Sequence, residues 1–325
     1  MKQKILICGA TGFIGRNMVE RFALNNNFEV VAIYNKRPLF QCENVNWIKA
    51  DLTNPVDVEK CLKGVNIVVQ AAATTSGSKD ILTKPYIHVT DNAVMNSLLL
   101  RQAYENKIEQ FIFFSCTVMY PSSDKALREE DFDESAPMHP RYFGVGSTKV
   151  YIERMCDFYS RISDTKFTVI RHSNIYGPYD KFDLERSHVL GATITKVMSA
   201  PSEGEIEVWG TGEEERDFLH VKDLVNFVEL AIQKQTSSYE LLNCGIGHPT
   251  SIKDLVQTIV QLSEKKLSLN HNLSSPTIKT NIHLDCKRAK EAFGWEPKIS
   301  LENGLRETIE WWKAYNLPAK KIAVG

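Results

Sequence analysis

The chain has 325 residues, which is enough for one large or two interlocked domains with a substantial buried core. Its 39 Lys and Arg residues against 40 Asp and Glu give a net charge of -1, which excludes a long-range field directed at nucleic acid or an anionic membrane. The seven cysteines are scattered, without a C-x-x-C pair, and argue against a disulfide framework and a structural zinc site. We therefore expect a cytoplasmic protein with no metal, no nucleic-acid partner and no membrane segment.

The first half of the chain alternates strand and helix patterns as a parallel, doubly wound sheet requires. Its predicted strands are 4–8, 28–33, 45–49, 66–70, 110–114 and 167–170. Its predicted helices are 14–24, 56–63, 92–106 and 148–160. After residue 171 the loops lengthen, with short strands predicted at 206–209 and 217–220 and helices around 188–199, 222–233, 251–264 and 301–315.

These elements predict an α/β fold, a Rossmann-type doubly wound parallel sheet with a smaller C-terminal α/β substrate-binding portion. We expect the dinucleotide-binding domain at 1–172 and the mainly substrate-binding domain at 173–325, from which segments such as 217–235 return to the first domain. Ligands bind at the carboxyl edge of such sheets, so the second portion should cover that edge.

Three glycines, Gly9, Gly12 and Gly15, stand between the first predicted strand and the first helix. In a dinucleotide site the first turns the chain off the strand, the second lets backbone approach a pyrophosphate, and the third lets the helix pack on the sheet. The phosphates then lie at the helix N-terminus, where unpaired N–H groups favour an anion. The alternative is an incidental glycine turn, but the second strand at the right distance favours dinucleotide binding.

The residues after the second strand bear on the choice of cofactor. Sites for NAD place an acid there for the ribose 2′-hydroxyl, whereas sites for NADP use basic groups for the 2′-phosphate. Here Tyr34 and Asn35 lead into Lys36 and Arg37, which favours NADP(H); NAD(H) is the alternative, with both cations merely solvated. Asp51 either binds the adenine amino group or caps the helix that begins near Asn54. The candidate cofactor residues are Gly9, Thr11, Gly12, Phe13, Ile14, Gly15, Lys36, Arg37, Asp51, Leu52, Ala71, Ala72, Ala73, Lys149 and His172.

A family resemblance rests on motifs spread over nearly the whole chain. They are Gly9 to Gly15, Ala71 to Ala73, Phe113 to Cys116, Asn174 to Phe182, Ser187 to Val189, and Val208 to Val221. On these residues the sequence resembles the extended short-chain dehydrogenase/reductases of the NAD-dependent epimerase/dehydratase family, and within them is similar to the GDP-L-fucose synthases. The resemblance implies an enzyme that acts on a GDP-linked sugar, and a homodimer paired through helices 92–106 and 148–160.

One departure from the family concerns its acid–base pair, a Tyr and a Lys four residues apart on one helix. The position four before Lys149 is Val145. Three readings stay open: Tyr142, two helical turns before the lysine, replaces the phenol if the helix starts early; His188 and a group near Cys116 move the proton; or the chemistry needs no tyrosine, or activity is lost.

Cys116 stands where the family has Ser or Thr, and Thr117 follows it, whereas the synthases' own cysteine corresponds to Val118. Cys116 is either catalytic or a small buried hydrophobe. The candidate catalytic residues are Lys149, His188, Cys116, Thr117 and Tyr142. The candidate substrate-binding residues are Asn174, His188, Val189, Lys196, Trp209 and Arg216, with Arg216 for a diphosphate.

The expected activity is that of an NADP(H)-dependent GDP-4-ketosugar C4-reductase or epimerase/reductase. The alternatives are an NAD-dependent epimerase or dehydratase acting on a UDP- or dTDP-sugar, and a dinucleotide-binding homologue without catalysis.

Overall fold

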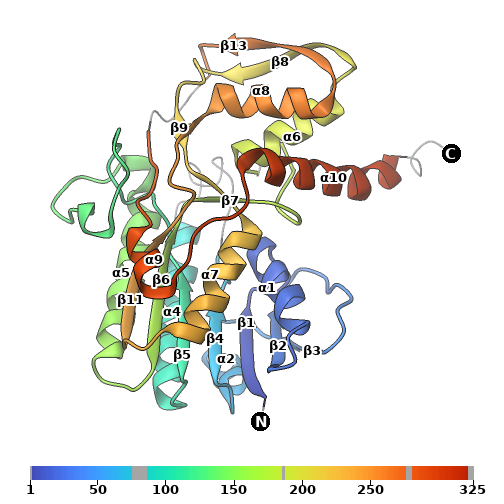
Figure 1. Ribbon diagram of the computed structural model, residues 1–325. Helices are drawn as coiled ribbons and strands as arrows, with labels where there is room; N and C mark the ends of the chain where they lie inside the picture. The colour runs from blue at the N-terminus through green and yellow to red at the C-terminus, as the bar shows by residue number, and fades with distance from the viewer. Residues whose placement is uncertain (1, 75–85, 185–186, 276–279, 321–325) are drawn as a thin grey trace.

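A seven-stranded, wholly parallel sheet forms the centre of the lower part of the molecule in Figure 1. The computed structural model describes residues 2–74, 86–184, 187–275 and 280–320. The strands are β1 (Gln3–Cys8), β2 (Phe28–Tyr34), β3 (Val45–Lys49), β4 (Ile67–Gln70), β5 (Gln110–Phe114), β6 (Lys166–His172) and β11 (Tyr239–Cys244). Their order, β11-β6-β5-β4-β1-β2-β3, is doubly wound about β1 and β4, which confirms the predicted fold class.

Helices cover both faces of the sheet. One face carries α1 (Phe13–Ala23), α7 (Val221–Lys234) and α9 (Lys287–Phe293), and the other carries α2 (Pro55–Leu62), α4 (Tyr86–Glu105) and α5 (Phe143–Ser160). The β1 side chains alternate accordingly: Ile5 and Ile7 enter one apolar cluster, whereas Leu6 and Cys8 enter the other. Because both faces are buried, the strands read as continuous apolar runs.

The upper part of the molecule is built on a separate apolar cluster that includes Tyr176, Ile194, Leu255 and Trp312. Its helices are α6 (Val189–Ser199), α8 (Ile252–Ser263) and α10 (Leu301–Lys320). Its strands pair as β8 (Glu203–Trp209) with β13 (Lys266–Asn272), and β9 (Glu215–Arg216) with β12 (Thr250–Ser251). The parallel pair β7 (Asn174–Tyr176) and β10 (Phe218–His220) links the two parts.

Two helices begin earlier than the sequence predicts. Helix α4 starts at Tyr86 rather than at residue 92, and α5 starts at Phe143 rather than at 148. Gly144 and Gly146 weaken the helical pattern, but they are needed for packing: a Cβ on Gly146 would lie 2.8 Å from Met138 Sδ, and one on Gly144 3.0 Å from Val89 Cγ2. Tertiary contact therefore overrides the low helix propensity of glycine here.

Several elements have no counterpart in the prediction, namely β7, β9, β11, β12, β13 and α9, together with the single 3₁₀ turns Glu129–Asp131 and Pro140–Tyr142. The edge strand β11 carries the polar Asn243, which is fully buried and hydrogen bonded, so its sequence lacks an unbroken apolar run. Among the helices of the described ranges, none combines the length and apolarity that crossing a bilayer requires.

The turn between β1 and α1 brings three segments of backbone into contact. Gly9 has a φ of +69°, and a Cβ on it would lie 2.7 Å from Ala72 Cα. A Cβ on Gly15 would lie 2.2 Å from the Gly9 carbonyl oxygen. The helix, the turn and the end of β4 therefore approach as closely as their backbones allow, which only residues without a Cβ permit at these two positions.

We predict that Gly15→Ala lowers the free energy of unfolding by about 1–3 kcal/mol, because the added methyl group overlaps a carbonyl oxygen and forces α1 away from β1. Dinucleotide binding should weaken in parallel. Gly64→Ala is the matched control, since no heavy atom lies within 4 Å of its Cβ position and only its φ of +67° is unfavourable. Thermal unfolding and NADPH titration measure both effects; equal melting temperatures and equal affinities in the two variants would contradict the close-packing argument.

Candidate active site

The cofactor end of the site is the N-terminus of α1. Gly12 is its N-cap residue, it makes no side-chain cap, and the first turn contains no acid, so the backbone N–H groups face a position suited to an anion. A Cβ on Gly12 would lie 3.1 Å from the Gly9 carbonyl oxygen, so this turn is a cradle that a larger residue would fill. Thr11, Phe13 and Ile14 are half-buried along it, and the site fits a dinucleotide pyrophosphate.

The predicted adenosine-side residues lie at the ends of β2 and β3. Lys36 and Arg37 are exposed. Hydrogen bonds from Thr53 are the main cause that lowers the pKa of the Asp51 carboxyl, and the nearby charge of Lys36 lowers it further. The N-cap of α2 is Asn54, whose side chain accepts from Val56 N at 2.9 Å. Asp51 therefore does not cap that helix.

The small residues after β4 separate into packing and exposed positions. Ala71 and Ala72 pack against the two apolar clusters on either face of the sheet, and Ala73 is exposed. Leu52 is buried in the cluster beneath α2 and α4. The alanines thus provide close backbone approach and core packing together.

Lys149 lies on α5 and points at the end of β5. Its Nζ donates to the Phe114 carbonyl oxygen at 2.6 Å and lies 4.7 Å from the centre of the Phe113 ring. Burial lowers the pKa of Lys149, and the negative charges of the Cys116 thiolate and of Glu153 raise it. Conversely, burial raises the pKa of Cys116 and the Lys149 ammonium lowers it. The structure therefore brings the predicted lysine and cysteine together.

Tyr142 is the last residue of a 3₁₀ turn and the N-cap residue of α5, so the helix begins directly after it, five residues earlier than the sequence predicts. Burial raises the pKa of Tyr142, the Arg216 guanidinium lowers it, and the Cys116 thiolate raises it. The phenol thus lies within electrostatic reach of both residues and is protonated at neutral pH. Thr117 is half-buried beside Cys116, and its carbonyl oxygen accepts from Tyr120 N at 3.0 Å.

Two histidines extend this set of groups. His172 ends β6, and burial lowers its pKa to about 4, with further lowering by the Lys149 and His188 charges. His188 is the N-cap residue of α6, but its side chain makes no capping hydrogen bond. The surrounding protein lowers the pKa of His188, and the Lys181 ammonium lowers it further.

The predicted substrate residues form two groups. Arg216 Nη1 donates to the carbonyl oxygens of Glu215, at 2.8 Å, and of Thr280, while Asn174 Nδ2 donates to the Asp217 carbonyl oxygen at 3.2 Å. In the second group, Lys196 Nζ lies 5.5 Å from the ring centre of Trp209. The indole is 50 % exposed, with Nε1 bonded to Glu207, and the neighbouring Val189 is 38 % exposed.

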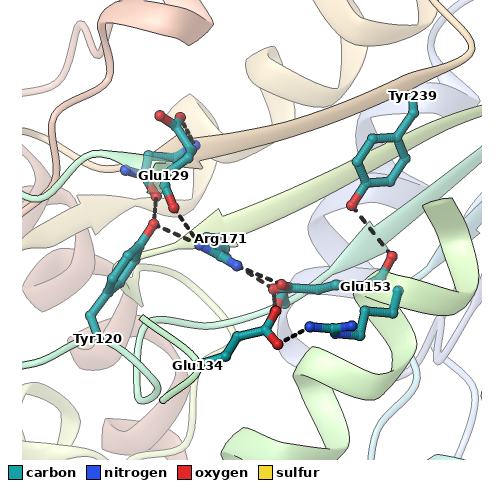
Figure 2. Close-up of polar contacts among 9 residues, drawn as sticks. Tyr120, Glu129, Glu134, Glu153, Arg171 and Tyr239 are labelled. Atoms are coloured by element: carbon teal, nitrogen blue, oxygen red, sulfur yellow. Dashed lines mark hydrogen bonds and ion pairs between the residues drawn. The ribbon is translucent and has the colours of Figure 1, made fainter. Parts of the chain in front are cut away.

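A buried ion pair near these groups escaped the sequence analysis. Glu153 and Arg171 face each other between α5 and β6, with Nη2 2.7 Å from Oε2 (Figure 2). The available signal was Arg171 itself, since an arginine inside an apolar strand needs a buried carboxylate. Lys181 was also missed as a neighbour of His188.

Within 2–74, 86–184, 187–275 and 280–320, no three His, Cys, Asp or Glu residues gather as a metal site.

A dinucleotide cradle beside a set of acid–base groups at the carboxyl edge of a parallel sheet defines a nicotinamide-dependent α/β enzyme. Comparison with known proteins specifies it further, since residues 5–245 match the NAD dependent epimerase/dehydratase family. The chain belongs to this family, as the sequence motifs predicted.

Individual relatives resemble the chain over nearly its full length. GDP-L-colitose synthase of Yersinia pseudotuberculosis is 26% identical over 95% of this chain and 97% of its own. GDP-L-fucose synthase of Sinorhizobium fredii is 28% identical over 95% of each. Among solved structures, UDP-glucose 4-epimerase of Thermotoga maritima superimposes with a TM-score of 0.84 at 25% identity, covering 96% of this chain and 99% of that one.

Proposed function

We propose that this enzyme uses NADP(H) to reduce the C4 carbonyl of a GDP-linked 4-ketosugar, with or without inversion at a carbon beside that carbonyl. The observation that carries the proposal is the electrostatically connected set Arg216, Tyr142, Cys116, Lys149, His172 and His188 beside the glycine turn. It combines a cation for a diphosphate with proton donors for a carbonyl oxygen. The relatives named for GDP-L-colitose and GDP-L-fucose synthesis support the nucleotide.

Reduction needs a hydride for the carbonyl carbon and a proton for its oxygen. The bound nicotinamide supplies the hydride. We assign the proton to Tyr142, because its phenol is protonated at neutral pH and lies within electrostatic reach of Cys116, which stands at the family's Ser or Thr position. Lys149 holds the nicotinamide ribose, and its charge lowers the pKa of Cys116. This assignment takes the first of the three readings that the sequence left open.

Inversion beside the carbonyl needs a base on one face of the sugar and an acid on the other, because the carbon next to a keto group is acidic. His188 serves as the base, since its lowered pKa leaves the imidazole neutral near pH 7. Cys116 supplies the second group. Arg216, Asn174, Lys196 and Trp209 would then bind the nucleotide portion, with Arg216 on the diphosphate.

The cofactor preference rests on Lys36 and Arg37, exposed beyond β2 where a 2′-phosphate would lie. The second candidate is an NAD-dependent epimerase acting on a UDP- or dTDP-sugar. It is supported by the similarity to a UDP-glucose 4-epimerase over 96% of the chain.

We also propose that the enzyme is a homodimer paired through α4 and α5. These helices pack on one another and still present large apolar side chains outward, namely Val94, Tyr104, Tyr151 and Phe158, which are 40–48% exposed. Several large exposed apolar side chains on two packed helices are typical of a protein interface.

The direct test is anaerobic incubation with NADPH or NADH and a panel of GDP-, UDP- and dTDP-4-ketosugars, followed by nicotinamide absorbance and product NMR. We expect oxidation of NADPH with a GDP-sugar, and no oxidation by Lys149→Met. A preference for NADH with a UDP- or dTDP-sugar would favour the second candidate. Tight binding of both nucleotides without oxidation would overturn the proposed reaction.

Two variants separate the proton donors. Tyr142→Phe should lower kcat about 100-fold because it removes the phenolic proton. His188→Asn should slow inversion by a similar factor and leave GDP affinity within about threefold of wild type, because its role is proton transfer. Steady-state rates, solvent deuterium uptake beside the carbonyl and GDP titration measure these effects. Unchanged rates in either variant would remove that residue from the mechanism.

The dimer is tested by sedimentation of Phe158→Glu, in which a charge replaces the most exposed of the four apolar side chains on the surface of α4 and α5. We expect a monomer at concentrations where the wild type is dimeric. Leu24→Glu is the control, because Leu24 is 79% exposed at the end of α1 and away from this surface. A monomeric wild type, or a dimeric Phe158→Glu, would contradict the assignment.

A further inference from the structure

The ion pair between Glu153 and Arg171 is almost completely withdrawn from water. The two side chains are 5% and 3% exposed, and they meet through two parallel bonds, Nε to Oε1 at 3.1 Å and Nη2 to Oε2 at 2.7 Å (Figure 2). Such a pair carries a large desolvation cost and is retained only where its geometry and remaining hydrogen bonds are well satisfied. An apolar pair would fill the same space, so the charges call for an explanation other than packing.

The pair contacts the segments on either side of Cys116, and Arg171 Nη1 also donates to the Glu129 carbonyl oxygen at 3.1 Å. Ser115 Oγ donates to Glu153 Oε1 at 2.5 Å, which fixes the residue immediately before the cysteine. Arg171 Nη1 donates to the Tyr120 hydroxyl at 3.1 Å, which fixes the loop after it. The Tyr120 hydroxyl donates in turn to Asn243 Oδ1 at 2.8 Å on β11. The loop that carries Cys116 and Thr117 is therefore held at both ends.

Glu153 and Arg171 are each close in sequence to a residue of the candidate active site on the same helix or strand. Glu153 follows Lys149 by one helical turn on α5, and Arg171 immediately precedes His172 on β6. We propose that Glu153 and Arg171 form a positioning unit, which fixes Cys116 and Lys149 relative to each other and keeps the net charge beneath them at zero. The catalytic importance of these two residues rests on the proposed function, whereas the positioning can be measured without substrate.

The charges that face Cys116 make the idea testable. Lys149 and Glu153 face it from α5, Arg171 from β6, and Tyr142 from the turn before α5. Burial raises the pKa of the thiol, Lys149 and Arg171 lower it, and Glu153 raises it. Because the pair is neutral, its two contributions oppose one another. Removal of one partner leaves the other charge uncompensated, so the two single variants must shift the pKa in opposite directions.

The experiment measures the pH dependence of Cys116 alkylation by iodoacetamide in the full-length protein without added nucleotides. Peptide mapping separates Cys116 from Cys42 and Cys286, the other cysteines that are not fully buried. We expect Glu153→Gln to lower the apparent pKa by about one pH unit and Arg171→Met to raise it by about one unit. The double variant should return to within about 0.3 units of wild type, since its net charge is again zero.

Tyr120→Phe is the matched control, because it removes one hydrogen bond of the network and leaves both charges, so the thiol pKa should not move. Shifts of the same sign in both single variants, or none in variants with a wild-type near-ultraviolet spectrum, would show a merely structural pair and overturn the proposal. If neither single variant folds, the double variant decides: a thiol pKa that differs from wild type contradicts a neutral unit, and an unchanged value supports it.

Steady-state kinetics then connects the unit to catalysis. With a GDP-4-ketosugar that the wild type reduces, both single variants should show a lower kcat with little change in KM, because the altered groups are those of the reaction rather than of binding. Equal kcat values across the series would overturn the catalytic part of the proposal. A wild type inactive toward every sugar would instead refute the proposed function while the alkylation result stands.

Discussion

The close approach of α1 to the end of β1 is the constraint on which the rest of the structure depends. The helix touches the turn after β1 at Gly15, and the turn touches the backbone that follows β4 at Gly9, so neither position has room for a side chain. This contact fixes the direction of α1, and with it the direction of its unpaired N–H groups. The location of a bound pyrophosphate, and therefore of everything assembled around it, follows from those two positions.

The acid–base groups reach the carboxyl edge of the sheet from separate elements. Lys149 comes from α5, Cys116 from the end of β5, His172 from the end of β6, and His188 from the start of α6 in the upper part of the molecule. The candidate site is therefore shared between the two parts of the molecule. The buried Glu153–Arg171 pair binds the lower elements together, so the sheet side of the site is the fixed side (Figure 2).

Local patterns in the sequence were sufficient for six of the seven strands of the sheet and for the turn, because buried parallel strands and a glycine turn each have a characteristic pattern within a few residues. The start of α5 was not accessible in this way. Two glycines argue against a helix there, and only packing explains them: Gly144 lies against Val89 of α4, and Gly146 against Met138 of the segment before α5. Strand β11 was missed because Asn243 belongs to a buried polar network whose partners come from three other segments.

In the candidate site too, the individual residues could be proposed from the sequence, whereas their arrangement could not. The sequence identified Lys149, Cys116 and His188 from motifs, but their mutual proximity depends on how β5, α5 and α6 meet. The spacing from Lys149 shows that position 145 lacks the usual phenol. Where Tyr142 lies relative to Lys149 could be decided only once the start of α5 was known. Glu153 and Arg171 are eighteen residues apart on different elements, and their pairing has no local pattern.

We propose that this site transfers hydride to a sugar carbonyl without a tyrosine at position 145. We would use NADPH deuterated at both C4 positions of the nicotinamide with a GDP-4-ketosugar, and locate the deuterium by NMR. The account predicts deuterium at C4 of the sugar in a reduced product. A sugar that returns without deuterium, while the cofactor keeps its label, would contradict it.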